Sequence, residues 1–238
     1  MTQTREETKK EMEKKIEEKN AYPCGEESWE DESLVREAQA AYRVKQQGEY
    51  TLEDYYALPD DQRVELIDGV IYDMSAPLLV HQAIAGDIYS QLWQFVKRNG
   101  GNCMPFVAPV DVQLDKDNRT MVQPDVLVVC DQSKMKEHCV YGAPDFVVEV
   151  LSKSTRKKDM YLKLDKYRNA GVREYWMVDP KSKRVIVYEF ENEDRPVIYE
   201  FDGKIPVGIY DGKCVIDFEE IYQSIDFLYQ TEDEPDEE

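Results

Sequence analysis

The chain has 238 residues, with 30 basic and 50 acidic side chains and therefore a formal net charge of −20 at pH 7. A chain of this length holds one domain with extensions or two small domains. Its negative charge argues against a protein that coats nucleic acid without specificity. No apolar run approaches the roughly 18–20 residues needed to cross a bilayer, and the charged start of the chain argues against a secretory signal.

Cysteine and histidine are few in this chain. The five cysteines contain no CxxC pair, so the sequence predicts neither a disulfide framework nor a structural zinc site, and it favours a reducing, cytoplasmic location. The chain has only two histidines, which excludes a site with several histidine ligands. A metal site would therefore have to use carboxylates.

The two ends of the chain are more charged than its centre. Residues 1–48 are rich in paired Lys and Glu and are predicted to be an extension, helical in part or disordered. This extension either has no chemical role or binds a partner protein. Residues 49–229 carry the apolar periodicity of a folded domain. Residues 230–238 form an acidic tail that is predicted to be disordered.

The folded domain begins with helical and strand patterns in alternation. A threonine followed by acidic residues predicts a short helix over 51–61. Residues 63–74 are predicted to form a β-hairpin around the turn Asp68-Gly69. Apolar residues at helical spacing predict a long helix over 78–99, which stops at two glycines.

The second half of the domain is richer in strands. Apolar segments predict strands over 106–114, 121–130 and 143–152, and the last two have the continuous apolar runs of strands buried on both faces. A helix is expected over 154–171, with Ser154 or Thr155 as its N-cap. Two further strands and a terminal helix follow, over 173–180, 183–190 and 217–229. This order predicts a mixed α/β (α+β) domain with one central sheet.

Two acidic residues stand within apolar strands. Asp125 is at the head of PDVLVV and Glu149 is inside FVVEVL. A buried carboxylate is costly unless it is paired or binds a metal. If the two strands are neighbours, the two carboxylates form one cluster, which suits Mg²⁺ or Mn²⁺. Alternatively, each acid is satisfied separately by backbone amides or by an arginine.

A basic segment follows Glu149. Residues 153–173 contain eight lysines and arginines, in a protein whose net charge is strongly negative. Positive charge beside a carboxylate pair is what phosphodiester chemistry requires, because lysine and arginine hold the phosphate. The candidate nucleic-acid-binding residues are Lys153, Arg156, Lys157 and Lys158. Asp159 and Lys163 are four residues apart and share a helix face, either within the site or as an ordinary surface ion pair.

Three further residues are candidates for the same site. Glu65 lies among apolar residues in RVELIDG, and Asp111 lies in PVDVQL. Either acid is a candidate for an additional metal ligand. His81, near the start of the long helix, is placed to reach the same cleft, although a lone histidine more often has a structural role.

Several strings in this chain closely resemble the Uma-two family (DUF820), whose members are inferred restriction endonucleases of the PD-(D/E)XK nuclease superfamily. The strings are VELIDGVIYDMS, then QPDVLVV, then APDFVVEVLSKSTRKKDMYLKLDKYRNAGVREYWMVDP. The resemblance covers roughly residues 50–190 and leaves both charged ends outside. It implies a restriction-endonuclease-like fold, in which helices flank a mixed central sheet and a metal site lies at one end.

The resemblance also implies roles for single residues. Asp125 matches the PD element, and Glu149 matches the acidic residue of the (D/E)XK element. The superfamily lysine would fall at Leu151 and is absent, but Lys163 on the following helix matches the position to which the family's lysine has moved. Glu65 matches the acid that the first core elements contribute in many superfamily members.

The implied activity is metal-dependent hydrolysis of phosphodiester bonds in DNA. In that mechanism Asp125 and Glu149, with the carbonyl of Val150, bind one or two Mg²⁺ or Mn²⁺ ions, and Lys163 orients the attacking water or stabilises the developing charge. The alternative is a catalytically inactive nuclease-fold protein that binds nucleic acid or serves as an accessory or regulatory subunit. A homodimer is the default expectation for an enzyme that cuts both strands.

Overall fold

A computed structural model describes residues 45–230, apart from 60–61, 154–155, 157 and 192–194. The chain divides between Val44 and Lys45. Residues 1–44 of the predicted N-terminal extension and residues 231–238 of the predicted acidic tail therefore lie outside the described residues. The proposed domain boundaries remain predictions.

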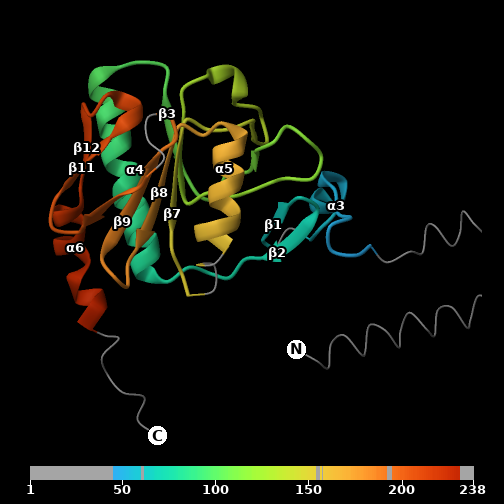
Figure 1. The fold of residues 1–238 in the computed structure, drawn as a ribbon, viewed down its shortest axis with the longest axis horizontal. Helices are drawn as coiled ribbons and strands as arrows, with labels where there is room; N and C mark the ends of the chain where they lie inside the picture. Colours follow the sequence, from blue (N-terminus) through green and yellow to red (C-terminus); the bar gives the residue numbers. More distant parts are fainter. Residues whose placement is uncertain (1–44, 60–61, 154–155, 157, 192–194, 231–238) are drawn as a thin grey trace, which may run out of the picture. The chain divides into compact units, whose positions relative to one another are not determined.

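A six-stranded mixed sheet forms the centre of the domain (Figure 1). Its strand order is β10-β9-β8-β7-β5-β3, and every neighbouring pair is antiparallel except β7 and β8. The strands span β3 Met104–Val107, β5 Val126–Val129, β7 Phe146–Val150, β8 Glu174–Asp179, β9 Arg184–Glu189 and β10 Val197–Glu200. The predicted mixed central sheet is confirmed.

Each face of this sheet packs against its own apolar core. On one face the core includes residues of helices α4, Leu79–Asn99, and α6, Phe218–Gln230, together with the hairpin of β11, Lys204–Val207, and β12, Cys214–Asp217. On the other face the core includes Tyr167 of helix α5, Leu164–Ala170. Figure 1 shows α4 and α6 beside one another and α5 apart from them, so the sheet is the middle layer of the domain.

A hairpin and a short helix lie next to the second core. Strands β1, Val64–Ile67, and β2, Val70–Asp73, pair antiparallel, as the sequence predicts. Their turn places Asp68 at φ 52° and Gly69 at φ 80°, which is the pair of positive angles that an Asp-Gly hairpin turn favours. The predicted first helix is present as α3, Leu52–Tyr56.

The sequence predicts a single strand over 106–114, and this prediction is wrong in extent. β3 ends at Val107, a cis peptide bond joins Ala108 to Pro109, and the chain resumes as β4, Val112–Gln113. β4 leaves the central sheet and pairs with β6, Val140–Tyr141. A proline cannot donate to a ladder of hydrogen bonds, so it separates the two strands.

The helix predicted over 154–171 is also different from the expectation. Among the described residues of this segment, Lys158–Lys163 form a π-helix and Leu164–Ala170 form the α-helix α5. Gly171, at φ 94°, ends α5 as predicted. Isolated π-helical turns frequently occur at functional sites.

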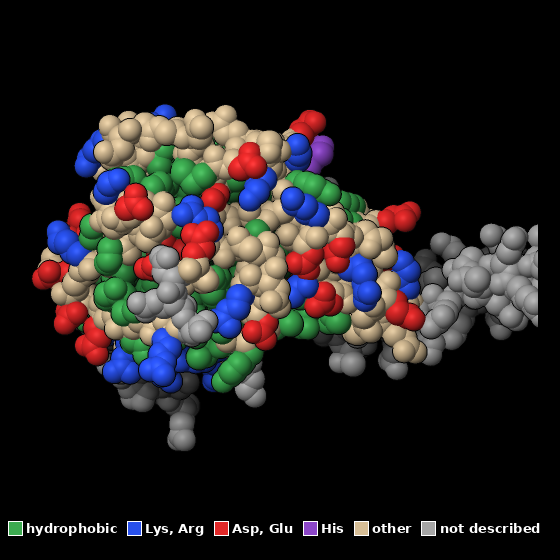
Figure 2. Space-filling model, turned by 45° about the horizontal axis from the view of Figure 1, so that its top comes forward, with side chains coloured by type: hydrophobic (Ala, Val, Ile, Leu, Met, Phe, Trp, Pro, Cys, Tyr) green, Lys and Arg blue, Asp and Glu red, His purple; other side chains and the backbone are tan. Residues whose placement is uncertain are grey.

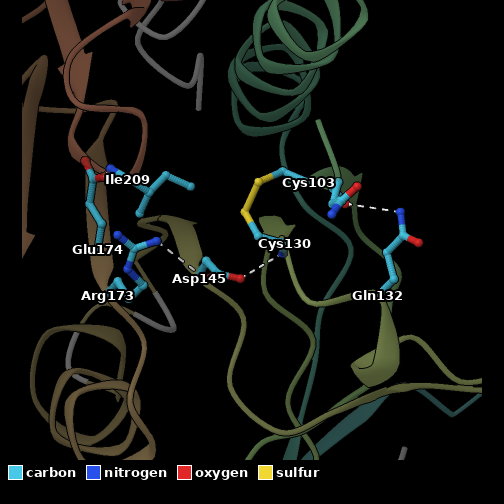
Figure 3. Close-up of a disulfide and its surroundings, with 8 residues drawn as sticks. Cys103, Cys130, Gln132, Asp145, Arg173, Glu174 and Ile209 are labelled. Carbon is cyan, nitrogen blue, oxygen red and sulfur yellow. Dashed lines mark hydrogen bonds and ion pairs between the residues drawn. A yellow bond between two sulfur atoms is a disulfide. The ribbon is translucent and has the colours of Figure 1, made fainter. Parts of the chain in front are cut away.

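The sequence predicts no disulfide framework, but the described residues contain a disulfide that the sequence did not indicate. Cys103 and Cys130 are joined by a disulfide, and they flank the paired strands β3 and β5 (Figure 3). The register pairs Met104 with Val129, so the two cysteines come directly opposite one another where the pairing ends. Cys139 and Cys214 are free.

The carboxylate of Asp145 contacts the chain beside the disulfide. The amide of Cys130 donates to the carboxylate of Asp145, which also lies near Arg173 (Figure 3). These contacts brace the end of the sheet that carries the disulfide.

Within the described residues, every helix is too short or too polar to span a lipid bilayer.

Candidate functional site

The register of the sheet brings the two strand acids together. β5 and β7 are antiparallel neighbours in which Val126 pairs with Val148, so Asp125 lies opposite Glu149. Residues directly opposite on neighbouring strands point to the same face of a sheet. Asp125 and Glu149 therefore form one cluster at the ends of these two interior strands, on the face of the sheet against which α5 packs.

Asp125 is held by a backbone amide and a histidine. Its Oδ2 atom accepts a hydrogen bond from the amide of Val150 at 2.7 Å and lies 3.1 Å from Nε2 of His81. Burial lowers the pKa of His81, but Asp125 and the Val150 backbone outweigh it and the net pKa is raised. Nδ1 of His81 is buried and makes no hydrogen bond. His81 thus belongs to the site, where the sequence left its role open.

Lys163 lies inside a cage of carboxylates. Its Nζ atom is 2.7 Å from Oε1 of Glu65, 2.8 Å from Oε1 of Glu149 and 3.6 Å from Oδ1 of Asp159, and its side chain is 3% exposed. The lysine thus reaches back from the helix to the strand acid. Asp159 and Lys163 are both buried, so they do not form the surface ion pair that the sequence left as an alternative.

A second lysine shares Glu65. Nζ of Lys158 lies 2.6 Å from Oε2 of Glu65, and the Lys158 side chain is 13% exposed. The backbone amide of Gln123 donates to Oε1 of Glu65 at 3.0 Å. Both oxygens of this fully buried carboxylate are therefore occupied.

Burial and charge move the pKa values of the cage in different directions. Burial works to raise the pKa of Glu65, but Lys163 and Lys158 outweigh it and the pKa is lowered. Burial also raises the pKa of Glu149, and because Lys163 is its main counter-charge while Asp159 and Asp125 lie close, that pKa ends well above its usual range. The two carboxylates that share Lys163 are therefore shifted in opposite directions.

The cluster opens into a cavity of about 440 Å³. All four carboxylates, both lysines and His81 line this cavity: Glu65, Asp125, Glu149, Asp159, Lys158, Lys163 and His81. A volume of this size admits part of a nucleotide and several water molecules. The arrangement presents hard oxygen ligands and positive charge to anything that enters.

The remaining predicted residues lie in several places. Asp111 is outside the cavity lining and accepts hydrogen bonds from Tyr55 at 2.9 Å and from the Gln123 side chain at 2.8 Å. Lys153 lines the cavity and is exposed. Arg156 donates to Asp179 at 2.7 Å. Lys157 lies outside the described residues.

On one face of the domain, side chains of both charges are mixed. On the face shown in Figure 2, basic and acidic side chains are interspersed, and no broad basic area stands out. This face therefore shows no extended basic surface for an anionic ligand.

Two tyrosines in the site were not singled out from the sequence. The hydroxyl of Tyr167 donates to Oε1 of Glu149 at 2.6 Å, and the hydroxyl of Tyr175 donates to the carbonyl of Asp159 at 3.1 Å. Tyr167 lies four residues after Lys163, which is the spacing that places two side chains on one helix face. This spacing was a signal for Tyr167, whereas Tyr175 depends on the pairing of β7 with β8.

The donors present suit a divalent cation only in part. Within the described part of the chain, no group of three or more His, Cys, Asp or Glu side chains is arranged to hold a metal ion. Mg²⁺ usually keeps several waters and binds proteins through one or two carboxylates. Asp125 and Glu149, with the nearby backbone of Val150, meet that smaller requirement.

A comparison with protein families assigns the chain to a family. A family model named Uma2, described as "Putative restriction endonuclease", matches residues 52–206. The chain belongs to the Uma2 family. The match contains Glu65, Asp125, Glu149 and Lys163, so the resemblance drawn from the sequence is confirmed.

One solved structure supports the fold of this Uma2 protein. It is the crystal structure of "a putative nuclease belonging to DUF820" from Anabaena variabilis ATCC 29413, with a TM-score of 0.60 and 21% identity. The match covers 73% of this chain and 97% of the other. At this identity the likeness establishes the restriction-endonuclease-like fold. The comparison with curated proteins found no match.

Proposed function

We propose that this Uma2 protein is a divalent-metal-dependent nuclease that hydrolyses phosphodiester bonds in DNA. The observation that carries the proposal is the pairing of Asp125 with Glu149 on neighbouring strands, with Lys163 at 2.8 Å from Glu149. Two hard carboxylates and a charged lysine in one cavity are the parts that metal-assisted phosphodiester hydrolysis requires. The family description supports DNA as the substrate class.

Asp125 and Glu149 would hold Mg²⁺ or Mn²⁺, with the carbonyl of Val150 as a backbone donor. A divalent ion at that place lowers the pKa of a bound water and offsets the charge of the phosphate. Glu149 has to give up its proton to act as a ligand, because burial and the neighbouring acids raise its pKa well above the usual range. Ion binding is therefore expected to strengthen as the pH rises.

The other residues of the site position these ligands. Tyr167 and Lys163 both donate to Oε1 of Glu149. These two hydrogen bonds fix the orientation of the carboxylate, and neither of them uses Oε2. Lys163 is kept charged because Glu149, Glu65 and Asp159 outweigh the effect of burial and raise its pKa. A fixed positive charge at the floor of the cavity stabilises the charge that develops on the phosphate in the transition state.

Cleavage assays test this function. Plasmid and single-stranded DNA are incubated with the protein in Mg²⁺ or Mn²⁺, beside the variants Asp125→Asn and Lys163→Met. A matched control is Lys204→Met, which removes an exposed lysine paired with Asp217 at 2.8 Å. Metal-dependent cleavage that survives in Lys204→Met and disappears in the other two variants supports the proposal.

Two outcomes would contradict the nuclease. Cleavage that persists in Asp125→Asn would come from another site or another protein. DNA binding without cleavage of either substrate in either metal would favour the alternative, a nuclease-fold protein that binds nucleic acid or serves as an accessory subunit. A homodimer, and a partner for the N-terminal extension, remain predictions.

A further inference from the structure

The two lysines of the site differ in how firmly they are held. Lys163 is 3% exposed and contacts Glu65, Glu149 and Asp159. Lys158 is 13% exposed and, among the described residues, makes an ion pair with Glu65. Its ammonium group also lies 5.4 Å from the centre of the Tyr72 ring. Lys163 is therefore part of the floor of the cavity, while Lys158 lies closer to its mouth.

Loss of the contact between Lys158 and Glu65 has different consequences from loss of the contact between Lys163 and Glu65. If Lys158 turns away, Glu65 keeps Lys163 at 2.7 Å and the Gln123 amide at 3.0 Å. If Lys163 turns away, Glu149 and Asp159 lose the cation they share. A buried charge left without its partner is strongly unfavourable. Because Glu65 keeps two contacts on Oε1 when Lys158 leaves Oε2, Lys158 is the lysine that can exchange its carboxylate for another anion at the lower cost.

The π-helical turn explains why both lysines reach one carboxylate. Residues five apart in an α-helix point about 140° away from one another around the axis. A π-helix bonds each residue to the fifth along the chain, so side chains five apart lie nearly above one another. Lys158 and Lys163 are the two ends of the π-helix Lys158–Lys163, and they take the two oxygens Oε2 and Oε1 of Glu65.

We propose that Lys158 is the phosphate-binding lysine of this site, held ready on Glu65 by the π-helical turn and transferred to the backbone phosphate of a bound nucleic acid, while Lys163 stays in the carboxylate cage. This inference rests on the proposed nuclease function. The exchange replaces one carboxylate contact by one phosphate contact, and no bond is made or broken. Tyr72, beside Lys158, keeps the ammonium group near the cavity during the exchange.

Two variants and two assays test the division of roles. Binding of DNA is followed by fluorescence anisotropy in Ca²⁺ over a range of salt concentrations, and cleavage is followed in Mn²⁺. Lys158→Met is expected to weaken binding and raise KM by about tenfold, with kcat nearly unchanged, because one charged hydrogen bond to phosphate is lost. The slope of log K against log salt is expected to fall by about 0.9, the value for one phosphate contact. Lys158→Arg is expected to restore the slope.

Lys163→Met serves as the contrasting variant and is expected to lower kcat. Its salt slope is expected to match that of the unmodified protein. If Lys158→Met leaves KM and the salt slope unchanged in a protein that cleaves DNA, the inference is overturned and the nuclease stands. A loss of kcat at unchanged KM in Lys158→Met would also overturn it. A protein that neither binds nor cleaves DNA would overturn the proposed function as well.

Discussion

Lys163→Met removes the positive charge that three buried acids share. The lysine contacts Glu65 at 2.7 Å, Glu149 at 2.8 Å and Asp159 at 3.6 Å, and its side chain is 3% exposed. Methionine is flexible and of similar length, so the change removes charge with little change in packing. Loss of one partner of a buried ion pair costs about 3–5 kcal/mol in free energy of unfolding. Because Glu65 keeps Lys158, we expect the lower end of that range, about 3 kcal/mol at pH 8.

The loss is expected to depend on pH. In the variant, a buried acid that has lost its lysine becomes neutral by binding a proton. Each pH unit above the ordinary pKa of that acid adds about 1.4 kcal/mol to the free energy needed to bind the proton. An acid whose pKa is raised on folding contributes stability at low pH and loses it as the pH rises. The deficit of Lys163→Met is therefore smaller at pH 5 than at pH 8.

Urea denaturation followed by tryptophan fluorescence measures both quantities. Lys204→Met is the control, because that lysine is 66% exposed and pairs with Asp217 at the surface, and little change is expected. A deficit at pH 8 below about 1 kcal/mol, the range of a surface pair, would refute the reasoning that the carboxylates depend on Lys163. An equal deficit at both pH values would refute the account of proton uptake.

Three further predictions concern stability, each measured by urea denaturation. Burial raises the pKa of Glu174 to about 7 from 4.5. The free energy of unfolding should therefore fall by about 3 kcal/mol as the pH rises from 4.5 to 7. Glu174→Gln should remove this dependence on pH. Replacement of Cys103 and Cys130 together by serine should cost about 2–4 kcal/mol relative to the oxidised protein; an unchanged midpoint would contradict this. Gly69→Ala should cost more than about 1 kcal/mol, because φ is +80° and the new Cβ would lie 2.6 Å from a backbone oxygen, whereas a Cβ at Gly203 meets nothing within 4 Å.

The strands and their two acids could be predicted from the sequence because their apolar runs are long and uninterrupted. Asp125 and Glu149 stand out as charges inside those runs, and the strands are neighbours, which is the condition under which the sequence predicts one cluster. The resemblance implied that Lys163 reaches back to the strand, and it lies 2.8 Å from Glu149. These predictions succeeded because each depends on local pattern and on one pair of adjacent strands.

Other features depend on information that a local pattern does not contain. A π-helix and an α-helix share almost the same composition, so Lys158–Lys163 could not be distinguished from a regular helix. The disulfide joins residues 27 apart in the chain, and its formation depends on the register of β3 against β5. The approach of Glu65 to Lys163 spans almost a hundred residues and depends on how the hairpin docks onto the second core.

Binding of Mn²⁺, measured by electron paramagnetic resonance, tests the central claim most directly. The claim is that Asp125 and Glu149 hold a divalent cation where their strands meet. We expect one or two bound ions, with an affinity that rises from pH 6 to pH 8 because the pKa of Glu149 is raised. Asp125→Asn should lose at least about 90% of that affinity, in line with the tenfold or greater effects seen at metal sites, and Lys204→Met should keep it. Equal Mn²⁺ binding by Asp125→Asn and the unmodified protein, or none by either with DNA present, would contradict the account.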